Sequence, residues 1–320
     1  MVTKLPLNTL NVILLVILTT LSMTIGVADF SWANIFTQSH DLQLLLVSRI
    51  PRTLAIILTG ASLSVAGMVL QIVLRNRFIE PSMTGATQSA TLGILAASLL
   101  LPASSLLLKM SIATIAALMG IVLFMGLLSR LPPTQKLLVP LIGIIYGSIL
   151  EALGTFIAYE TDTLQLISVW FTGDFSSVLA GRYELLWLSA ILVVVIYFLA
   201  DRLTIAGMGK EISTGLGVSH EKMLWISLIA VALISAVVVV SVGAIPFVGL
   251  VVPNIVSRIA GDRLRKSLPS VILMGANLLL ICDIVGRVIN IPYEIPVSTI
   301  FGVIGTGVFL YLLMRRKYAG

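Results

Sequence analysis

Residues 53–74 read TLAIILTGASLSVAGMVLQIVL and contain no charged side chain. A helix needs about 20 consecutive apolar residues to cross the hydrocarbon core of a bilayer, so this run has the length and character of a membrane span. The whole chain of 320 residues is 58% hydrophobic and 11% charged, with a mean hydropathy of +1.10. Soluble domains carry about 25% charged residues, so this chain could not cover its surface in water. The sequence therefore predicts an all-helical polytopic membrane protein.

Apolar runs between polar breaks predict about ten membrane spans. They cover residues 9–28, 53–74, 84–102, 105–129, 137–158, 184–200, 224–243, 246–260, 269–289 and 295–313. Two of them are atypical, because the third opens with the polar segment 84–89 and the eighth is short and contains Pro253. Irregular helices at membrane depth persist only where protein buries them or where they line a cavity. We therefore expect these two spans to face away from lipid.

The basic residues predict the orientation of the spans. With the N-terminus in the cytoplasm, five of the 20 lysines and arginines lie outside and the other 15 inside, and the positive-inside rule then places both termini in the cytoplasm. The five outer residues are Arg49, Arg52, Lys109, Arg182 and Arg287. The net charge of +6 thus reflects membrane orientation and not a nucleic-acid partner. The apolar run from Leu10 to Ile25 is long for the apolar region of a signal peptide and only Lys4 precedes it, so we expect it to be retained as a span.

The sequence contains no catalytic or nucleotide-binding motif. The segment 209–211, Gly-Lys-Glu, lacks the earlier glycine and the following serine or threonine of a phosphate-binding loop. The single Cys282 and the separated His40 and His220 offer no metal or haem site, so we expect no cofactor. The chain is therefore not expected to be an enzyme. If it moves a solute uphill, the energy must come from an ion gradient or from another subunit.

An ion gradient would require ionisable residues within the membrane, and two candidates are present. Asp283 stands four residues before Arg287, so the two side chains can form an ion pair near the outer end of the ninth span. Glu151 lies in the fifth span with no cation near it in sequence. It either lines a water-filled path or hydrogen-bonds a neighbouring helix in its protonated form. One such carboxylate is thin support for a proton-coupled carrier.

Several segments are too specific for generic membrane helices. Gly60, Ser64, Gly67 and Gln71 share one face of a helix, where small side chains let another helix approach and Gln71 can hydrogen-bond across the contact. The other segments, in chain order, are SRIPRTL at 48–54, RNRFIEP at 75–81, GAIPFVGLVVPN at 243–254 and EIP at 294–296.

In this order the segments resemble the FecCD family, the permeases of ferric-siderophore, haem and cobalamin ABC importers. The resemblance runs from about residue 45 to the C-terminus. The chain departs from the family at Asn254, where a histidine is usual, and at Gly307, where the last helix often has a proline. It also has NRFIEP at 76–81 in place of the usual N-P-L-A-x-P. The run PNIVSRIAGD at 253–262 looks like the branch that serves catecholate and mixed-ligand siderophores, such as the anguibactin and petrobactin permeases.

The resemblance implies a fold, a function and partners. The fold is a type II ABC importer permease in a single transmembrane domain over 1–320, with an inverted repeat that relates about 53–158 to about 224–313. The function is that of the permease subunit, which carries a ferric siderophore across the bacterial inner membrane while a separate subunit hydrolyses ATP. The implied partners are an ABC ATPase, a periplasmic or lipoprotein siderophore-binding protein, and a second permease subunit, identical or homologous.

The resemblance also implies roles for particular residues. Arg49, Arg52 and Arg287 match periplasmic arginines that receive acidic residues of the binding protein, a task suited to the guanidinium fork. The loop 208–219 matches the segment that couples the permease to the ATPase, and we expect two very short helices there, separated at 215–217. Its coupling residues are Gly209, Lys210, Glu211, Ile212, Ser213, Gly215, Leu216 and Gly217. Gln88 and Glu151 are candidates for the lining of the translocation path.

Three alternative functions stay open at this point. A cobalamin or haem permease of the same family would differ in the iron sources that support growth. A proton-coupled secondary carrier would be blocked by an uncoupler and indifferent to an ATPase. An intramembrane enzyme is disfavoured, because the sequence shows no paired carboxylates, no metal-ligand spacing and no nucleophile motif.

Overall fold

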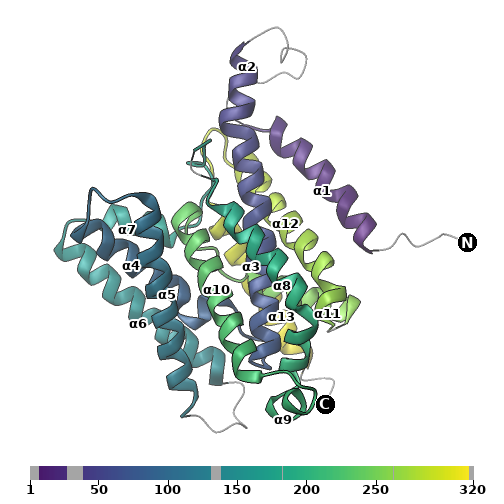
Figure 1. Cartoon of the computed structure of the whole chain (residues 1–320). Coiled ribbons are helices and arrows are strands. Elements are labelled where there is room, and N and C mark those ends of the chain that lie inside the picture. The colour runs from purple at the N-terminus through teal and green to yellow at the C-terminus, as the bar shows by residue number, and fades with distance from the viewer. Residues whose placement is uncertain (1–6, 27–38, 131–137, 182, 262, 317–320) are drawn as a thin grey trace, which may run out of the picture.

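The computed structural model describes residues 7–26, 39–130, 138–181, 183–261 and 263–316, and this part of the chain is helical with no β-strand (Figure 1). The first half contains α1 (Leu7–Thr24), α2 (Ser39–Leu44), the π-helical segment η2 (Leu45–Arg49), α3 (Ile50–Val73), the 3-10 turn η3 (Pro81–Thr84), α4 (Ala86–Leu100), α5 (Leu106–Leu128), α6 (Leu138–Glu160) and α7 (Leu164–Phe171). The second half contains α8 (Leu186–Gly207), α9 (Lys210–Gly215), α10 (His220–Val242), α11 (Val248–Ala260), α12 (Leu264–Val288) and α13 (Val297–Arg316). The predicted all-helical fold class is confirmed.

Seven helices in the described part are long and apolar enough to cross a membrane by length and composition. They are α1, the continuous helical stretch Asp41–Val73, α5, α6, α8, α10 and α12. Three further apolar helices are shorter, namely α4, α11 and the segment Val297–Tyr311 of α13. Each of the ten predicted spans overlaps one of these helices.

The helix α3 lies at the centre of the bundle. It packs against α8, α10, α11 and α12, and most of its side chains are buried. In contrast, α1 lies at the outside of the bundle, where it packs mainly against α12 (Figure 1). The short helices α2 and α9 lie at opposite ends of the molecule (Figure 1). We call these ends the α2 end and the α9 end.

Glycines on α3 allow two other helices to approach its backbone. A Cβ atom at Gly67 would overlap the carbonyl of Gly249 in α11, and one at Gly60 would overlap the carbonyl of Gly275 in α12. Gln71 Nε2 donates a hydrogen bond to Gly249 O across the first of these contacts, at 3.1 Å. The predicted packing face of α3 is therefore confirmed, and its small residues set the distance between the central helices.

The two atypical spans, α4 and α11, both begin after turns with left-handed backbone. Gly85 (φ +72°) precedes α4, and Phe247 (φ +67°) precedes α11. The Glu80 carboxylate connects these two turns, since it accepts hydrogen bonds from Phe247 N at 2.9 Å and from Ser82 Oγ at 2.5 Å. Glu80 is buried, and it satisfies an N–H group that the start of α11 leaves without a helical acceptor. As predicted, α11 is buried along most of its length.

Pro51, near the start of α3, leaves one backbone carbonyl without the N–H donor that it would have in a regular helix. Proline has no N–H, so the carbonyl of Val47, four residues earlier, loses its helical donor. The N–H of Ala180, in the loop after α7, takes that place with an N···O distance of 2.9 Å. The π-helical segment η2, which ends at Arg49, is a local widening of a kind frequent at functional sites.

Several helix ends differ from the predicted spans, and one short helix was missed; the continuous stretch before Val73 begins at Asp41 and α12 begins at Leu264, both earlier than predicted. We expected the sixth span to end at residue 200, but α8 continues to Gly207. The reason is that Asp201 and Arg202 end an apolar run without ending a helix. In addition, the short helix α7 was not predicted, because its eight residues are too few for a periodic pattern to stand out.

The prediction of two short helices in the loop 208–219 was also wrong. This loop contains one helix, α9, followed by a turn at Leu216 and Gly217. The chain then passes directly into α10, whose first turn is capped by Ser219 through its contact with Lys222 N. The N-cap serine therefore begins the next long helix in place of a separate short one.

Candidate functional site

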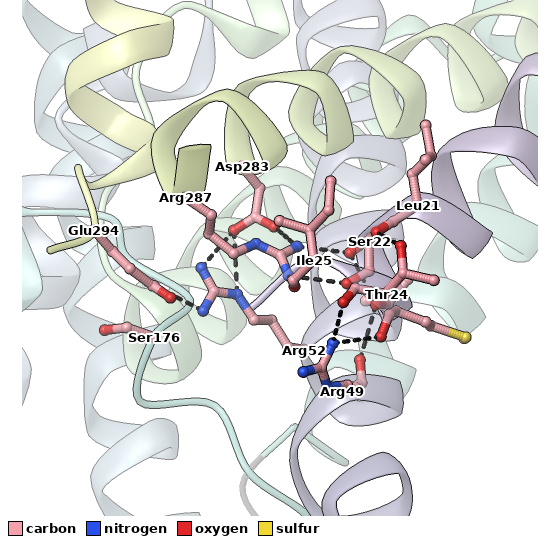
Figure 2. Close-up of polar contacts among 12 residues, drawn as sticks. Leu21, Ser22, Thr24, Ile25, Arg49, Arg52, Ser176, Asp283, Arg287 and Glu294 are labelled. Atoms are coloured by element: carbon pink, nitrogen blue, oxygen red, sulfur yellow. Dashed lines mark hydrogen bonds and ion pairs between the residues drawn. The ribbon is translucent and has the colours of Figure 1, made fainter. Parts of the chain in front are cut away.

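An arginine cluster lies at the α2 end of the bundle, where the start of α3 meets the end of α12 (Figure 2). Asp283 of α12 is at its centre, with a side chain that is 0% exposed. Arg52 Nη2 and Nε donate hydrogen bonds to Asp283 Oδ1 at 2.7 and 3.2 Å, and Arg287 donates to Asp283 Oδ2. Arg52 Nη1 also forms an ion pair with Glu294 Oε2 at 2.8 Å. The predicted ion pair between Asp283 and Arg287 is confirmed.

Two arginines of the cluster cap the C-terminus of α1. Arg49 Nη1 donates to two carbonyls of its last turn, at 2.6 and 2.8 Å, and Arg287 Nη1 donates to two others, at 2.9 and 2.8 Å. The four carbonyls belong to Ser22, Met23, Thr24 and Ile25. The last carbonyls of a helix have no partner within it and carry the negative end of its dipole. Because α1 has no basic residue in its own last turn, Arg49 and Arg287 supply this cap from other helices.

The cluster reaches the molecular surface at one pair of side chains. Arg49 and Arg287 are buried, whereas the side chains of Arg52 and Glu294 are 12% and 23% exposed. The structure thus brings the three predicted docking arginines together, but two of them are occupied inside the protein. An approaching carboxylate would meet Arg52 first, at the place that Glu294 now fills. The docking role of all three arginines stays a prediction.

The predicted coupling segment lies at the α9 end, where Gly209 separates α8 from α9 (Figure 1). Gly209 has φ +111°, and a Cβ atom there would overlap the Arg75 guanidinium, so this position requires glycine. Ser213 is buried, and its Oγ donates to the Gly209 carbonyl at 2.7 Å. Gly217 also has a left-handed backbone, with φ +76°. The glycines at both ends of α9 therefore allow its sharp entry and exit.

The outer surface of α9 combines charged and large apolar side chains. Lys210 forms an ion pair with Glu221 of α10 at 3.1 Å, and Glu211 is exposed. Ile212 and Leu216 are 52% and 61% exposed, although both are strongly apolar. The position of Gly215 has open space around it. A short helix with two exposed apolar side chains is suited to a groove on another protein.

The two path candidates come from neighbouring helices, Gln88 from α4 and Glu151 from α6. A Cβ atom at Gly147 of α6 would contact the Gln88 amide of α4, and Glu151 follows four residues after Gly147. Gln88 Oε1 is buried without a hydrogen-bond partner among the described residues. Glu151 is exposed, and Ser148 and Thr155 lie on the same side of α6. The structure therefore places a polar stripe on a helix that is otherwise apolar.

Among the described residues, no group of three or more histidine, cysteine, aspartate or glutamate side chains could hold a metal ion. Cys282 is buried next to Asp283.

Comparison with known proteins defines the class to which this chain belongs. The model of the FecCD transport family matches residues 14–315, and the chain therefore belongs to this family. A chain of a metal-chelate type ABC transporter, solved in an inward-facing conformation, has the same fold with a TM-score of 0.81. The two chains are 24% identical, and the match covers 96% of this chain and 98% of the other.

Two curated relatives are similar over almost their whole length. The petrobactin import system permease protein YclN of Bacillus subtilis (strain 168) is 45% identical over 306 residues, which is 95% of this chain and 97% of the relative. The ferric-anguibactin transport system permease protein FatD of Vibrio anguillarum is 39% identical over 299 residues, which is 93% of this chain and 95% of the relative. The resemblance to the petrobactin and anguibactin branch is confirmed. The chain is a multi-pass membrane protein of the ABC permease class.

The buried position of Asp283 leads to a test of the cluster. Asp283→Ala would leave Arg52 and Arg287 buried without their shared counter-charge, which costs about 3–5 kcal/mol for a buried ion pair. The control is Asp201→Ala, which removes an exposed ion pair with Arg265 that water and salt screen. We expect a clearly lower midpoint of thermal unfolding for the first variant only, measured in detergent by fluorescence-detected size-exclusion chromatography. Equal midpoints for the two variants would contradict the assignment of Asp283 as the centre of the cluster.

Proposed function

We propose that this chain is the permease subunit of an ABC importer and that it carries a ferric siderophore across the bacterial inner membrane. The observation that carries this proposal is the match to permeases of petrobactin and ferric-anguibactin import over more than nine tenths of the chain. The chain itself makes and breaks no bonds. A separate ATPase subunit supplies the energy by hydrolysing ATP, and a binding protein delivers the cargo.

The proposed topology has ten spans, with the α9 end in the cytoplasm and the α2 end outside. The seven long apolar helices and the three shorter ones supply the ten spans. The shorter α4 and α11 can cross because the irregular turns before them, joined by Glu80, are buried in protein. Basic residues near the junction of α8, α9 and α10 support the cytoplasmic position of the α9 end, namely Arg75, Lys210, Lys222 and Arg265. The distribution of lysine and arginine along the sequence places both termini on the same side in this proposal.

The proposed inverted repeat relates α3–α6 to α10–α13. The paired helices have similar lengths, with 24 and 23 residues in α3 and α10, and 15 and 13 in α4 and α11. The contacts follow the same correspondence. As α3 packs against α11 and α12, so α10 packs against α4 and α5. The first helix of each proposed repeat thus packs against the second and third helices of the other repeat. This reciprocal packing supports the repeat over about 53–158 and about 224–313.

The binding protein docks at the α2 end in this proposal. Its acidic residues are received by Arg49, Arg52 and Arg287, with Arg52 as the first contact because it lies at the surface of the cluster. Glu294 acts as a resident counter-ion that the incoming carboxylate replaces. Since Glu294 lies just before α13, this exchange releases the loop that leads into the last helix.

The ATPase docks at the α9 end. Ile212 and Leu216 enter a groove on that subunit, and the neighbouring charges of Lys210 and Glu211 orient the contact. Movement of the groove then displaces α9, and Ser213 and Gly209 transmit the displacement to the end of α8. Alternation between outward and inward access follows from this movement.

A second permease subunit covers the polar stripe on α6. An exposed carboxylate such as Glu151 is unfavourable against lipid, so protein or water must cover it. A central path between two permease subunits meets this need, with Glu151 and Gln88 along its lining. The cargo is recognised mainly by the binding protein, which accounts for the small number of polar groups on the path.

Docking through Arg52 predicts opposite effects for the two partners of one ion pair. Arg52→Gln removes the receiving cation and should weaken binding of the cognate binding protein about tenfold or more. Glu294→Gln removes the competing carboxylate and should strengthen binding. Lys109→Gln, which changes an outer lysine on α5 away from the cluster, is the matched control. Affinity is measured on the purified permease–ATPase complex in nanodiscs, and a wild-type affinity for both cluster variants would exclude Arg52 as a docking residue.

Coupling through α9 is tested by transport in cells that lack the gene. Ile212→Glu combined with Leu216→Glu should abolish uptake of radiolabelled ferric siderophore, because a charged α9 cannot enter an apolar groove. Both side chains are exposed, so the variant should insert in the membrane as wild type does. Lys222→Glu, an exposed change at the same end, should retain uptake. Full uptake by the α9 variant, combined with its loss on adding an uncoupler, would favour a proton-coupled carrier instead.

A further inference from the structure

A cavity of about 430 Å³ opens at the α9 end between α3, α8 and α11. Its lining combines two arginines and two hydroxyl groups with an apolar part. The lining residues are Met68, Gln71, Ile72, Arg75, Arg77, Thr204, Gly207, Met208, Pro253 and Ser257. None of these residues is acidic, so the charge of the lining is positive.

The Arg75 side chain is held in place beside the cavity. Arg75 follows the end of α3 with a left-handed backbone (φ +51°), a conformation that few non-glycine residues adopt. Its Nε donates to the Gly207 carbonyl at 2.8 Å and so caps the end of α8. The Nη side of the guanidinium lies against Gly209, where a Cβ atom would overlap it. The hydrogen bond from Nε fixes the guanidinium at the lining of the cavity, to which Arg75 contributes.

Arg77 brings a second guanidinium to the same cavity. Asn254 Nδ2 donates to the Arg77 carbonyl at 2.7 Å and holds its backbone against α11. Arg77 Nη1 donates to Ser257 Oγ at 3.3 Å, which places the charged group beside a hydroxyl on the lining. Guanidinium groups recognise phosphate through paired N–H donors, and a hydroxyl adds a further donor.

We propose that this cavity binds the phosphate group of an anionic phospholipid. The guanidinium groups of Arg75 and Arg77 hold the phosphate, and the apolar side chains of Met68, Ile72 and Pro253 contact the glycerol and the first acyl carbons. Basic pockets between membrane helices on the cytoplasmic side take lipid headgroups in this way. The inference rests on the proposed function for the cytoplasmic position of the α9 end.

Such a lipid would act on the coupling segment. Arg75 follows α3 and contacts both Gly207 at the end of α8 and Gly209 at the start of α9. A phosphate bound to Arg75 would therefore link α3 to the joint between α8 and α9, where α9 moves relative to α8. A lipid in this cavity would therefore hold the joint in one position. The site lies apart from the arginine cluster at the α2 end.

The test is lipid binding by the purified full-length protein, which does not depend on transport. The protein in detergent is titrated with phosphatidylglycerol, with phosphatidylcholine or with inorganic phosphate. Retained lipid is counted by native mass spectrometry, and the midpoint of thermal unfolding is measured in parallel. We expect phosphatidylglycerol alone to be retained and to raise the midpoint. Equal effects of the two lipids, or an equal effect of inorganic phosphate, would overturn the proposal of an anionic lipid site.

Variants distinguish lipid binding in the cavity from non-specific attraction of an anionic lipid to exposed positive charges. Arg75→Gln with Arg77→Gln should weaken phosphatidylglycerol binding about tenfold or more. Thr204→Trp should also abolish retention, because it fills the cavity while keeping both arginines. Arg77→Gln alone leaves the cap on α8 intact, so it serves if the double variant is unstable. Arg258→Gln changes an exposed arginine of α11 outside the cavity and should bind as wild type does. Unchanged binding by Arg77→Gln and Thr204→Trp would place the lipid elsewhere.

Failure of this proposal would be distinct from failure of the proposed function. Siderophore uptake and its loss in the α9 variant are measured in cells and do not require a lipid in this cavity. Conversely, lipid retention is measured on the purified chain without ATPase, binding protein or cargo.

Discussion

A buried carboxylate between two guanidinium groups is the constraint on which the α2 end depends. Asp283 is inaccessible to solvent and accepts from both Arg52 and Arg287. Removing one charge of such a group leaves the others buried without compensation, so the members hold one another in place. Through these side chains α12 is joined to α3, to the loop before α13 and to the last turn of α1 (Figure 2).

The central helix α3 connects this cluster with the coupling segment. Arg52 lies in its first turn, and Arg75 lies just beyond its end, against the joint between α8 and α9. A helix of 24 residues is about 36 Å long, which is close to the thickness of a bilayer. Close contacts at Gly60 and Gly67 fix α3 against α12 and α11. One rigid helix thus reaches from the proposed docking surface to the proposed ATPase surface.

Local patterns in the sequence were sufficient for the long apolar helices, though not for the short helices α7 and α9, and for two kinds of contact: those within one helix and those across a regular helix face. Apolar runs predicted the helical fold, the small face of α3 was confirmed by its contacts with α11 and α12, and the spacing of Asp283 and Arg287 predicted their ion pair. The cap on α1 was not predictable, because Arg49 and Arg287 reach its carbonyls from distant parts of the chain. The hydrogen bond from Phe247 N to the Glu80 carboxylate was not predicted for the same reason. Such groups are far apart in sequence and meet only through tertiary packing, which the periodicity of a single segment does not predict.

The central claim is ATP-driven import by a permease of this family, and reconstituted transport tests it most directly. The purified chain is combined with its ATPase, its partner permease and its binding protein in proteoliposomes, and uptake of labelled ferric siderophore is measured. The account predicts uptake that requires ATP and the binding protein and that an uncoupler leaves unchanged. Uptake that proceeds without ATP and follows an imposed proton gradient would contradict it.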